Sequence, residues 1–454
     1  MVWFYDEDLD PSGLAESLQQ ILVHYPVFCG RYTASAPKRV ALNNTGVPLE
    51  VSVVDSSLEQ AISHLSSKSE AEAWNQEGQE QPEDYYNLFA CTVHEGYVPE
   101  KKAMDPDEGC PDQPLLAVKV TLFEGGGTAI GTLLQHRIGD AQTQIEFMKN
   151  WGRLFQSLVL EHEPDHDRCK LHSLLLEGST GGAEESAVRE HSSHALDVSR
   201  IALRPATQRR VPEFLPVISQ ILPATHVCLV SYSKATLQKM KTTVLAEIQQ
   251  QDTIQGGAPT EFVVSTDDVL SAYLWQVLCQ VRCAQLGIAS DSEEHTTCMR
   301  ALNVRKRTDP ELGPTFCGNA AIQIWTQLTV RELLSSTPAE IARCLRATIQ
   351  EYNPCNVAKH IDFLHSQQQE GHATSYSFDP LALTFIISSW MFDWQGVCFG
   401  VKTPICFDHG ALTPVTAVVV PRPQGEGVLC YIAGQEDAMQ HFGETMLLCS
   451  SATV

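Results

Sequence analysis

The first strongly patterned segment of the chain is residues 10–25. Its apolar residues recur every three or four positions, which places them on one face of a helix. Asp10 is a favourable helix-capping residue, and Pro11 suits the first helical turn. Residues 66–85 and 99–113 are polar and acidic, so we expect surface loops there. The first hundred residues therefore predict one amphipathic helix beside long loops.

A β-hairpin followed by a helix is predicted next. Residues 115–123 and 128–135 are apolar runs of strand length, and the glycines between them favour a tight turn. The second run ends at His136. A helix then begins near Asp140 or Ala141, and its apolar stripe consists of Ile145, Met148, Trp151, Phe155 and Leu158.

The second half of the chain predicts another mixed α/β unit. Residues 161–222 are rich in Gly, Ser and charge, so they predict a linker or a long crossover. Beyond it we expect a helix capped by Thr266 or Asp267 and another helix in residues 434–447. The strand-like runs are HVCLVSYS, MRALNVRKR, AAIQIWTQLTV, ALTFIISSW, TAVVVPRP and GVLCYIAG.

The domain boundaries follow from this change in character. We expect an N-terminal domain at residues 1–175, a crossover linker at 176–222 and a C-terminal domain at 223–454. A chain of 454 residues is long enough for two domains with large cores. Its hydrophobic fraction of 43% indicates a globular α/β protein rather than a disordered chain.

The net charge and the cysteines indicate which partners and which cellular compartment to expect. The formal net charge of −24 argues against a broad nucleic-acid surface, because such a surface needs clustered Lys and Arg. The 15 cysteines form no CxxC pair, and the acidic N-terminus lacks the basic region of a secretory leader. We therefore expect reduced thiols and a cytoplasmic protein. No apolar run approaches the ~20 residues that a membrane span needs.

The stretch LLQHRIGDAQT, residues 133–143, carries the strongest candidate chemistry. His136 lies at a predicted strand-to-helix junction, where a histidine is held rigidly and can serve as a general base. The HxxxD spacing alone is a weak signal, because a lone histidine at a strand end is more often structural. Asp140 serves equally well as a helix cap. Arg305 in LNVRKR is placed to pair with Asp140, which would fix the histidine loop.

Other enzyme classes lack their signatures in this chain. The histidines of HEPDHD (162–167) and HSSH (191–194) lie in polar segments without a rigid frame, so we expect no metal site. There is no HExxH, Walker loop, GxGxxG or GxSxG sequence. These absences argue against zincins, P-loop enzymes, dinucleotide-binding enzymes and serine hydrolases of the nucleophile-elbow type.

Several motifs together resemble the plant and fungal BAHD acyl-CoA-dependent acyltransferases. HRIGDAQT is similar to the HxxxD loop of that family. The other similar segments, in family order, are YDEDLDPSGLAESLQQILVHYPVFCGRY, STDDVLSAYLWQVLCQVRCA, ALNVRKRTDPELGPTFCGNA, ISSW and VVVPRPQGEGVLCYIA. The second family signature, DFGWG, departs here, because residues 391–404 read MFDWQGVCFGVKTP and retain only Phe399, Gly400 and Pro404.

The resemblance implies two chloramphenicol-acetyltransferase-like domains with mixed sheets and an interdomain channel. His136 would be the general base that deprotonates the acceptor, which attacks acyl-CoA directly in a ternary complex. Asp140 would pair with Arg305 and hold the loop. Trp390 would lie beside the acyl carbonyl and help to hold the oxyanion, with Ser388 nearby in the substrate site. The implied partners are acyl-CoA as co-substrate and a small-molecule alcohol or amine, without a permanently bound cofactor, and we expect a monomer.

Two other functions stay open. Condensation domains of peptide synthetases use a related HHxxxD motif on carrier-protein thioesters, although position 135 is Gln here. A non-catalytic binding relative is the other alternative, because the DFGWG region is altered. Family members also carry a few dozen residues before the point where this chain begins. The resemblance therefore leaves two alternatives open: a shortened gene model that lacks an N-terminal strand and part of the acceptor pocket, or a genuine variant of the family.

Overall fold

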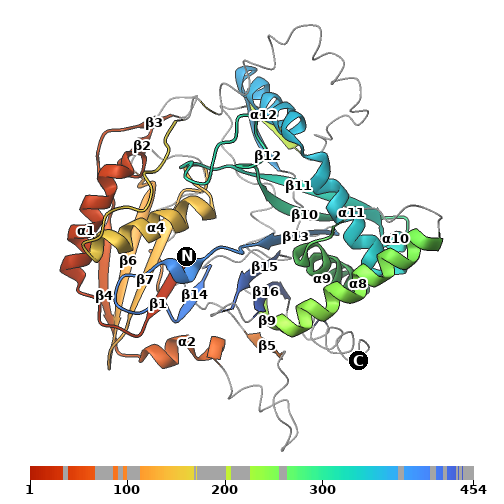
Figure 1. Ribbon diagram of the computed structural model, residues 1–454, viewed down its shortest axis with the longest axis horizontal. Helices are drawn as coiled ribbons and strands as arrows, with labels where there is room; N and C mark the ends of the chain where they lie inside the picture. Colours follow the sequence, from red (N-terminus) through yellow and green to blue (C-terminus); the bar gives the residue numbers. More distant parts are fainter. Residues whose placement is uncertain are drawn as a thin grey trace, which may run out of the picture.

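The computed structural model describes residues 1–33, 39–66, 85–89, 96–99, 113–167, 170, 201–205, 225–254, 263–376, 383–409, 416–422, 427–435, 438 and 442. Two mixed β-sheets lie next to each other, and helices cover the outer side of each one (Figure 1). One sheet has five strands in the order β14-β1-β7-β6-β4, and the other has seven in the order β11-β10-β13-β15-β16-β9-β5. Two further pairs of short strands, β2-β3 and β12-β8, stand apart from these sheets.

The five-stranded sheet is built around the predicted hairpin. Its strands are β1 (Val2–Tyr5), β4 (Leu49–Val54), β6 (Leu116–Phe123), β7 (Thr128–Leu134) and β14 (Cys406–Asp408). β6 and β7 pair antiparallel, as predicted, while β4 runs parallel to β6. Glycine is needed in the connecting turn, because Gly125, Gly126 and Gly127 have φ values of +85°, +107° and +103°.

Both faces of β1 are buried. Trp3 and Tyr5 of β1 face the core beneath α1 (Pro11–His24) and α4 (Ala141–Phe155). Val2 and Phe4 face a smaller cluster with Leu58 of α2 (Leu58–Ser66). The strand VWFY is therefore apolar throughout, since each of its side chains is removed from water.

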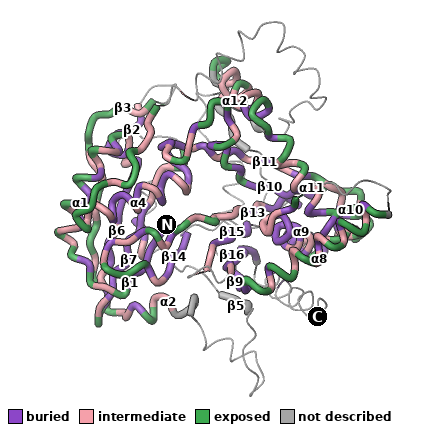
Figure 2. The backbone as a smooth tube through the Cα atoms, in the orientation of Figure 1, coloured by how far each residue is buried: buried purple, intermediate pink, exposed green. Residues whose placement is uncertain are grey.

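The seven-stranded sheet carries the larger helical layer. Its strands are β5 (Tyr85–Phe89), β9 (Thr225–Ser233), β10 (His295–Asn303), β11 (Ala321–Thr329), β13 (Thr384–Ser389), β15 (Thr416–Pro421) and β16 (Gly427–Gln435). The helices of this half are α8 (Lys234–Ile254), α9 (Thr266–Leu286), α10 (Val330–Ser335), α11 (Pro338–Glu351) and α12 (Pro354–Gln369). In this half of the protein, buried residues are concentrated in the central strands and in α9 (Figure 2).

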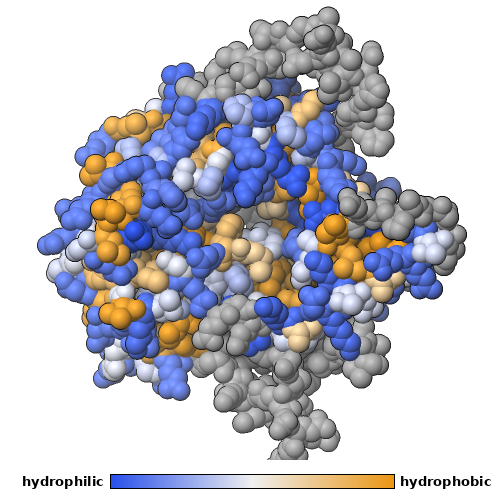
Figure 3. All heavy atoms as spheres, in the orientation of Figure 1, coloured by the Kyte–Doolittle hydropathy of each residue, from blue (hydrophilic) through white to orange (hydrophobic). Residues whose placement is uncertain are grey.

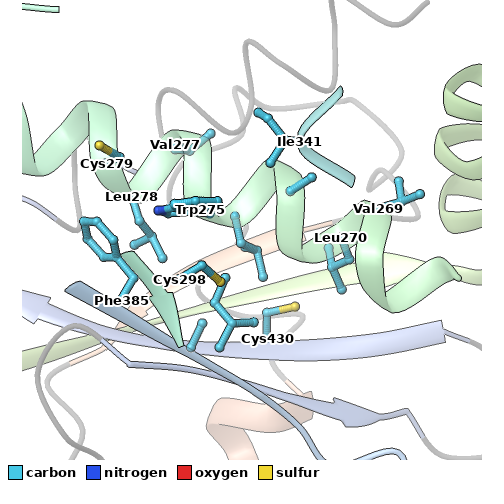
Figure 4. Close-up of a cluster of buried hydrophobic side chains, with 14 of the residues drawn as sticks. Val269, Leu270, Trp275, Val277, Leu278, Cys279, Cys298, Ile341, Phe385 and Cys430 are labelled. Atoms are coloured by element: carbon cyan, nitrogen blue, oxygen red, sulfur yellow. The ribbon is translucent and has the colours of Figure 1, made fainter. Parts of the chain in front are cut away.

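Side chains of the seven-stranded sheet alternate between two cores. Cys298, Phe385 and Cys430 point towards α9, where they pack with Trp275 and its apolar neighbours (Figure 4). The alternate residues of the central strands, such as Val418 and Tyr431, pack instead into the core of the five-stranded sheet. One face of this sheet thus packs against the helices of its own half, and the other face packs against the five-stranded half of the protein.

Each large sheet includes a strand from the other half of the chain. β14, at residues 406–408, pairs with β1 in the five-stranded sheet. β5, at residues 85–89, pairs with β9 at the edge of the seven-stranded sheet. The two sheets are therefore joined by exchanged strands in addition to the packing between them.

Most predicted elements are confirmed, with three corrections. Asp10 caps α1 and Asp140 caps α4, as expected. Leu158 does not belong to the α4 stripe, because α4 ends at Phe155 and Leu158 is 48% exposed. The cap of α9 is Ser265 rather than Thr266 or Asp267, since the Ser265 hydroxyl and the Asp268 carboxylate form a reciprocal capping box.

The third correction concerns LNVRKR. β10 ends at Asn303, and the chain turns immediately afterwards, so Arg305 lies in a loop and not in a strand. In the predicted linker, residues 201–205 form β8 (Ile201–Pro205), which pairs with β12 (His372–Tyr376). The expected loops at 66–85 and 99–113, most of the expected helix at 434–447 and the rest of the linker lie outside the described residues.

The remaining short elements are β2 (Arg31–Tyr32), β3 (Val40–Ala41), and the 3₁₀ turns η1 (Pro26–Cys29) and η4 (Trp394–Gly396). On the face seen in Figure 3, hydrophilic residues dominate, and hydrophobic ones gather in patches near the position of α1 at the left. Within the described part of the chain, no helix is long and apolar enough to cross a membrane.

Candidate active site

The loop that carries His136 is a tight turn between β7 and α4. The backbone N–H groups of Ile138 and Gly139 donate to the carbonyl of Gln135, at 2.8 and 3.3 Å. Ile138 is buried in the core beneath the helices, whereas His136 is exposed. A side chain at Gly139 would place its Cβ 2.7 Å from Thr143 Cγ2, so this position requires a glycine. The turn therefore points His136 outward from a rigid base.

Asp140 closes this turn and begins α4. Its Oδ1 accepts a hydrogen bond from the backbone N–H of Thr143 at 3.0 Å, as a helix cap does. Its Oδ2 accepts from the backbone N–H of Ala320 at 3.0 Å, although Ala320 lies 180 residues further along the chain. Asp140 is only 6% exposed, so its charge needs a partner.

Arg305 supplies that partner. Its Nη1 and Nη2 donate to the two carboxylate oxygens of Asp140 at 2.7 and 2.9 Å, which is the bidentate arrangement. The guanidinium is 2% exposed and also donates to the carbonyls of Phe316 and Gly318. The ion pair expected from the sequence is thus present, and it lies beneath the His136 loop rather than beside the imidazole.

Thr143 ties the same two segments together. Its hydroxyl donates to the Gly318 carbonyl at 2.9 Å and accepts from the Gly318 N–H at 3.1 Å. It also accepts from Arg305 Nη2 at 3.0 Å. We call residues 304–320 the clasp loop, because it connects β10 to β11 and holds the start of α4 from the other half of the protein. The site is therefore assembled from both halves.

The clasp loop also contacts His136 directly. Asn319 Nδ2 lies 3.2 Å from His136 Nδ1. Sequence reasoning missed Asn319, which it included only within the segment ALNVRKRTDPELGPTFCGNA. No local signal pointed to Asn319, because its contact joins two residues that lie 183 positions apart in the chain.

Ser388 and Trp390 form a second group at the end of β13. The Trp390 indole N–H donates to Ser388 Oγ at 3.0 Å, and its backbone N–H donates to the Val419 carbonyl at 2.7 Å. Ser388 is paired with Val418, whose side chain faces the core between the two sheets. Ser388 therefore points to the side on which the two halves meet.

An aromatic series continues from Trp390 into that interface. The Trp390 ring meets the His409 ring edge-on at a centroid distance of 5.6 Å, and His409 meets Tyr431 at 4.9 Å. Within the described residues, no hydrogen bond or ring contact links Ser388 or Trp390 to His136. The predicted site residues thus form two groups, one centred on the His136 loop and one at the end of β13.

The altered DFGWG region acts as an anchor on the N-terminal half. Phe399 meets the Trp151 ring of α4 edge-on at 4.7 Å. The Glu7 carboxylate accepts from the backbone N–H groups of Val401 and Lys402 at 3.1 and 3.0 Å. Gly152 of α4 is essential here, because a Cβ on it would lie 2.2 Å from the Cys398 carbonyl oxygen. This segment therefore leads the chain into β14.

The histidine-rich segments do not form a metal site within the described part of the chain. In HEPDHD, His166 contacts the backbone carbonyl of His24, and Asp165 pairs with Lys170. No group of three or more potential ligand side chains is close enough to hold an ion among the residues described. HSSH at 191–194 lies outside them.

Comparison with known proteins identifies the class to which this fold and these motifs belong. The model of the Transferase family matches residues 5–448, so the chain belongs to this family, the BAHD acyltransferases that its motifs resemble. The predicted family, enzyme class and two-domain fold are confirmed.

Individual relatives are distant but consistent. Anthranilate N-benzoyltransferase protein 1 of Dianthus caryophyllus is 24% identical over 69% of this chain and 62% of its own length. Shikimate O-hydroxycinnamoyltransferase of Nicotiana tabacum is 26% identical over 52% of this chain and 46% of its own length. The structure of F. graminearum TRI101 complexed with coenzyme A and T-2 mycotoxin superposes with a TM-score of 0.67 at 15% identity, covering 97% of this chain and 91% of that chain. The match to the carnation and tobacco relatives thus spans about half to three-fifths of their lengths.

Proposed function

We propose that this protein transfers an acyl group from acyl-CoA to the hydroxyl or amine of a small molecule, with His136 as the general base. The observation that carries this proposal is the placement of His136 on a glycine-dependent turn, exposed, and clasped from beneath by the buried Asp140–Arg305 pair. Relatives named for N-benzoyl and O-hydroxycinnamoyl transfer support both kinds of acceptor.

The reaction needs a base, a positioned thioester and stabilisation of the developing oxyanion. His136 takes the proton from the acceptor as the acceptor oxygen or nitrogen attacks the thioester carbonyl carbon. The carbon–sulfur bond then breaks, and the proton passes from the imidazolium to the CoA sulfur. Asp140 and Arg305 take no part in bond making, because both are buried and paired with each other. They fix the loop geometry on which the proton transfer depends.

Ser388 and Trp390 are proposed to serve the oxyanion. Because the Trp390 N–H is already donated to Ser388 Oγ, the Ser388 hydroxyl hydrogen is left to point at a substrate oxygen. Trp390 then acts through Ser388 by fixing its hydroxyl. Loss of one such donor typically lowers kcat by about 10²–10³-fold. We therefore expect Ser388→Ala to lower kcat strongly while substrate affinity changes little.

The remaining features belong to the same proposal. The acyl-CoA and the acceptor enter a channel between the domains at 1–175 and 223–454, which the linker at 176–222 connects. The protein acts as a cytoplasmic monomer without a permanently bound cofactor. Structures of a relative with coenzyme A and a second small molecule bound support a ternary complex of this kind.

The test is a screen of acyl-CoAs against alcohols and amines, followed by His136→Ala. We expect the variant to lose transfer by at least about 10²-fold, the usual contribution of general-base catalysis. His162→Ala is the matched control, because His162 is also exposed and contacts none of the site residues. Full transfer by His136→Ala would contradict the mechanism. Transfer from carrier-protein thioesters but not from acyl-CoA would instead favour the chemistry of condensation domains.

A separate measurement addresses the non-catalytic alternative. Coenzyme A should raise the thermal midpoint of the wild-type protein and of His136→Ala alike, because binding to the native state stabilises it. Binding without any transfer activity across the screen would identify the chain as a binding relative.

A further inference from the structure

The face of the seven-stranded sheet that is turned towards the five-stranded half, its inner face, is divided into two parts. β15, β16 and β9 contribute side chains such as Val418, Tyr431 and Leu229 to the core shared with that half. Among the described residues, no side chain of β10, β11 or β13 belongs to the same core. These three strands lie next to each other at one end of the sheet (Figure 1), so their inner face is left uncovered by it.

Side-chain alternation shows which residues line the uncovered part. On β10, Cys298 and Leu302 pack on the helical side, so Ala301 lies on the inner face. Ala301 is exposed, although β10 is flanked by β11 and β13. The same alternation places Gln323 of β11 and Ser388 of β13 on the inner face, where both are half-buried. We call this set the inner strip: Ala301, Gln323, Ile386 and Ser388.

The inner strip lies between the two groups of site residues. At one end, Asn303 of β10 donates to the side chain of Gln142 in the first turn of α4, which starts at the His136 loop. At the other end, Ser388 belongs to the oxyanion group. The strand register places Gln323 opposite Ala301, and Ser388 lies next to Ala301 on the other flank of β10. The strip therefore leads from the His136 loop past the oxyanion group.

The chemistry of acyl transfer indicates which part of the substrate lies along the inner strip. When the acceptor attacks, the thioester carbon carries four substituents: the oxyanion, the sulfur, the acceptor atom and the acyl chain. Ser388 serves the oxyanion, and His136 exchanges a proton with both the acceptor atom and the sulfur. The acyl chain is the substituent that remains, and it points away from His136. This placement of the acyl chain rests on the proposed function.

Gln323 carries an unsatisfied polar atom on this strip. Its Oε1 is buried and, within the described part of the chain, has no hydrogen-bond partner. A buried polar atom without a partner costs free energy, so native proteins contain few of them. Ala301 and Ile386 are apolar, and the strip has no charged member. A free amide oxygen on an uncharged surface is suited to accept a hydrogen bond from a hydroxyl of an uncharged acyl group.

We propose that the inner strip binds the acyl group of the substrate and that Gln323 selects acyl groups that carry a hydroxyl. Gln323 and Ser388 are two strand spacings apart, or roughly 10 Å. The glutamine side chain spans part of this gap, and a planar ring attached to the carbonyl carbon spans the rest. The substrate class that fits is a hydroxylated aromatic acyl-CoA, with its hydroxyl at the end of the ring far from the thioester.

Binding of two thioesters to the full chain tests this pocket without turnover. In His136→Ala, with no acceptor added, 4-hydroxybenzoyl-CoA should bind at least about fivefold more tightly than benzoyl-CoA, because benzoyl-CoA leaves the Gln323 oxygen unpaired. In His136→Ala/Gln323→Leu the two thioesters should bind equally. Equal affinities with Gln323 present, or an unchanged preference without it, would overturn the proposal. Failure of both thioesters to bind more tightly than CoA itself would overturn it as well.

The matched control for these measurements is Gln327→Leu. Gln327 lies on the same strand as Gln323, but it is exposed, and its Nε2 donates to Thr297 Oγ1 at 3.4 Å. Its replacement should leave the preference for the hydroxylated thioester unchanged. A loss of preference equal to that of Gln323→Leu would mean that any loosening of β11 abolishes it, and the assignment to Gln323 would be wrong.

Kinetics separate the acyl group from the acceptor. With an acceptor found in the screen, Gln323→Leu should lower kcat/KM for 4-hydroxybenzoyl-CoA relative to benzoyl-CoA by about fivefold or more, and the KM for the acceptor should stay the same. A raised KM for the acceptor with an unchanged acyl preference would assign the strip to the acceptor and overturn the proposal. If His136→Ala keeps full transfer activity, the proposed function fails, yet the binding preference still decides the role of Gln323.

Discussion

Replacing Arg305 with methionine should destabilise the protein strongly, because it strands a buried charge. Asp140 would keep only two of its partners, the N–H groups of Thr143 and Ala320. Breaking one side of a buried ion pair usually costs about 3–5 kcal/mol. The Phe316 carbonyl would lose both of its bonds from the guanidinium, at about 1 kcal/mol. The two backbone bonds that remain on Asp140 offset part of this, so we expect a loss of about 4 kcal/mol.

That loss is a large share of the usual folding stability of roughly 5–15 kcal/mol. It should appear in urea titrations as a lower midpoint at an unchanged slope. The double variant Asp140→Leu/Arg305→Met removes both charges together, and it should be less destabilised than the sum of the single variants by at least about 2 kcal/mol. A loss below about 1 kcal/mol for Arg305→Met, or strict additivity of the two changes, would refute the reasoning about burial. Asp140→Asn with full stability but no activity would indicate that Asp140 takes part directly in the chemistry.

Three further changes test other parts of the structure. Gly152→Ala should lower the free energy of unfolding by about 2 kcal/mol or more, as measured by urea titration, because the added Cβ would lie 2.2 Å from the Cys398 carbonyl oxygen. Gly13→Ala in α1 should cost far less, because its Cβ would meet the movable Phe155 ring at 3.1 Å. Equal losses of stability in the two variants would contradict this reasoning. Glu7→Gln should lower stability by about 1 kcal/mol, because the bonds from Val401 and Lys402 lose the charge of their acceptor; an unchanged midpoint would rule out the anchor. Burial lowers the pKa of His360 from 6.5 to about 4. As the pH falls, the unfolded chain therefore binds a proton at this histidine before the folded protein does. Stability should fall by up to about 3 kcal/mol as the pH drops from 6.5 to about 4. Urea midpoints at pH 7 and pH 5 should therefore differ less in His360→Leu than in the wild-type protein, and an equal pH dependence would exclude His360 as the cause.

Elements with a local signal were predictable from the sequence. The hairpin of β6 and β7 has apolar runs on either side of three glycines, and α1 and α4 have capping aspartates before an apolar face. β1 was missed because VWFY is buried on both sides and shows no alternation. Its neighbours in the sheet, β7 and β14, lie more than a hundred residues away, so no local pattern announces the pairing.

The parts of the site that depend on charged residues and motif spacing could be predicted from the sequence. The ion pair between Asp140 and Arg305 could be predicted from the sequence, because a buried carboxylate requires a cation and the two motifs occur together. The place of Arg305 was wrong, since Val304 continues the apolar alternation although the strand has already ended at Asn303. Asn319 carries no charge, and its contact with His136 spans 183 residues, so only the folded chain reveals it.

The exchanged strands determine when the protein can finish folding during its synthesis. β14 begins at residue 406, about 400 residues after β1, yet the two strands pair in the sheet that also contains the residues before His136. At the usual rate of about 5–20 residues per second, the ribosome needs tens of seconds between β1 and β14. During that interval β1 lacks its β14 neighbour, so the five-stranded sheet has an unpaired edge. The clasp loop that supports His136 is synthesised within the same interval. A nascent chain arrested before residue 406 should therefore be cleaved by proteases more readily than one that includes β14, and its active site should mature only after β14 has been synthesised.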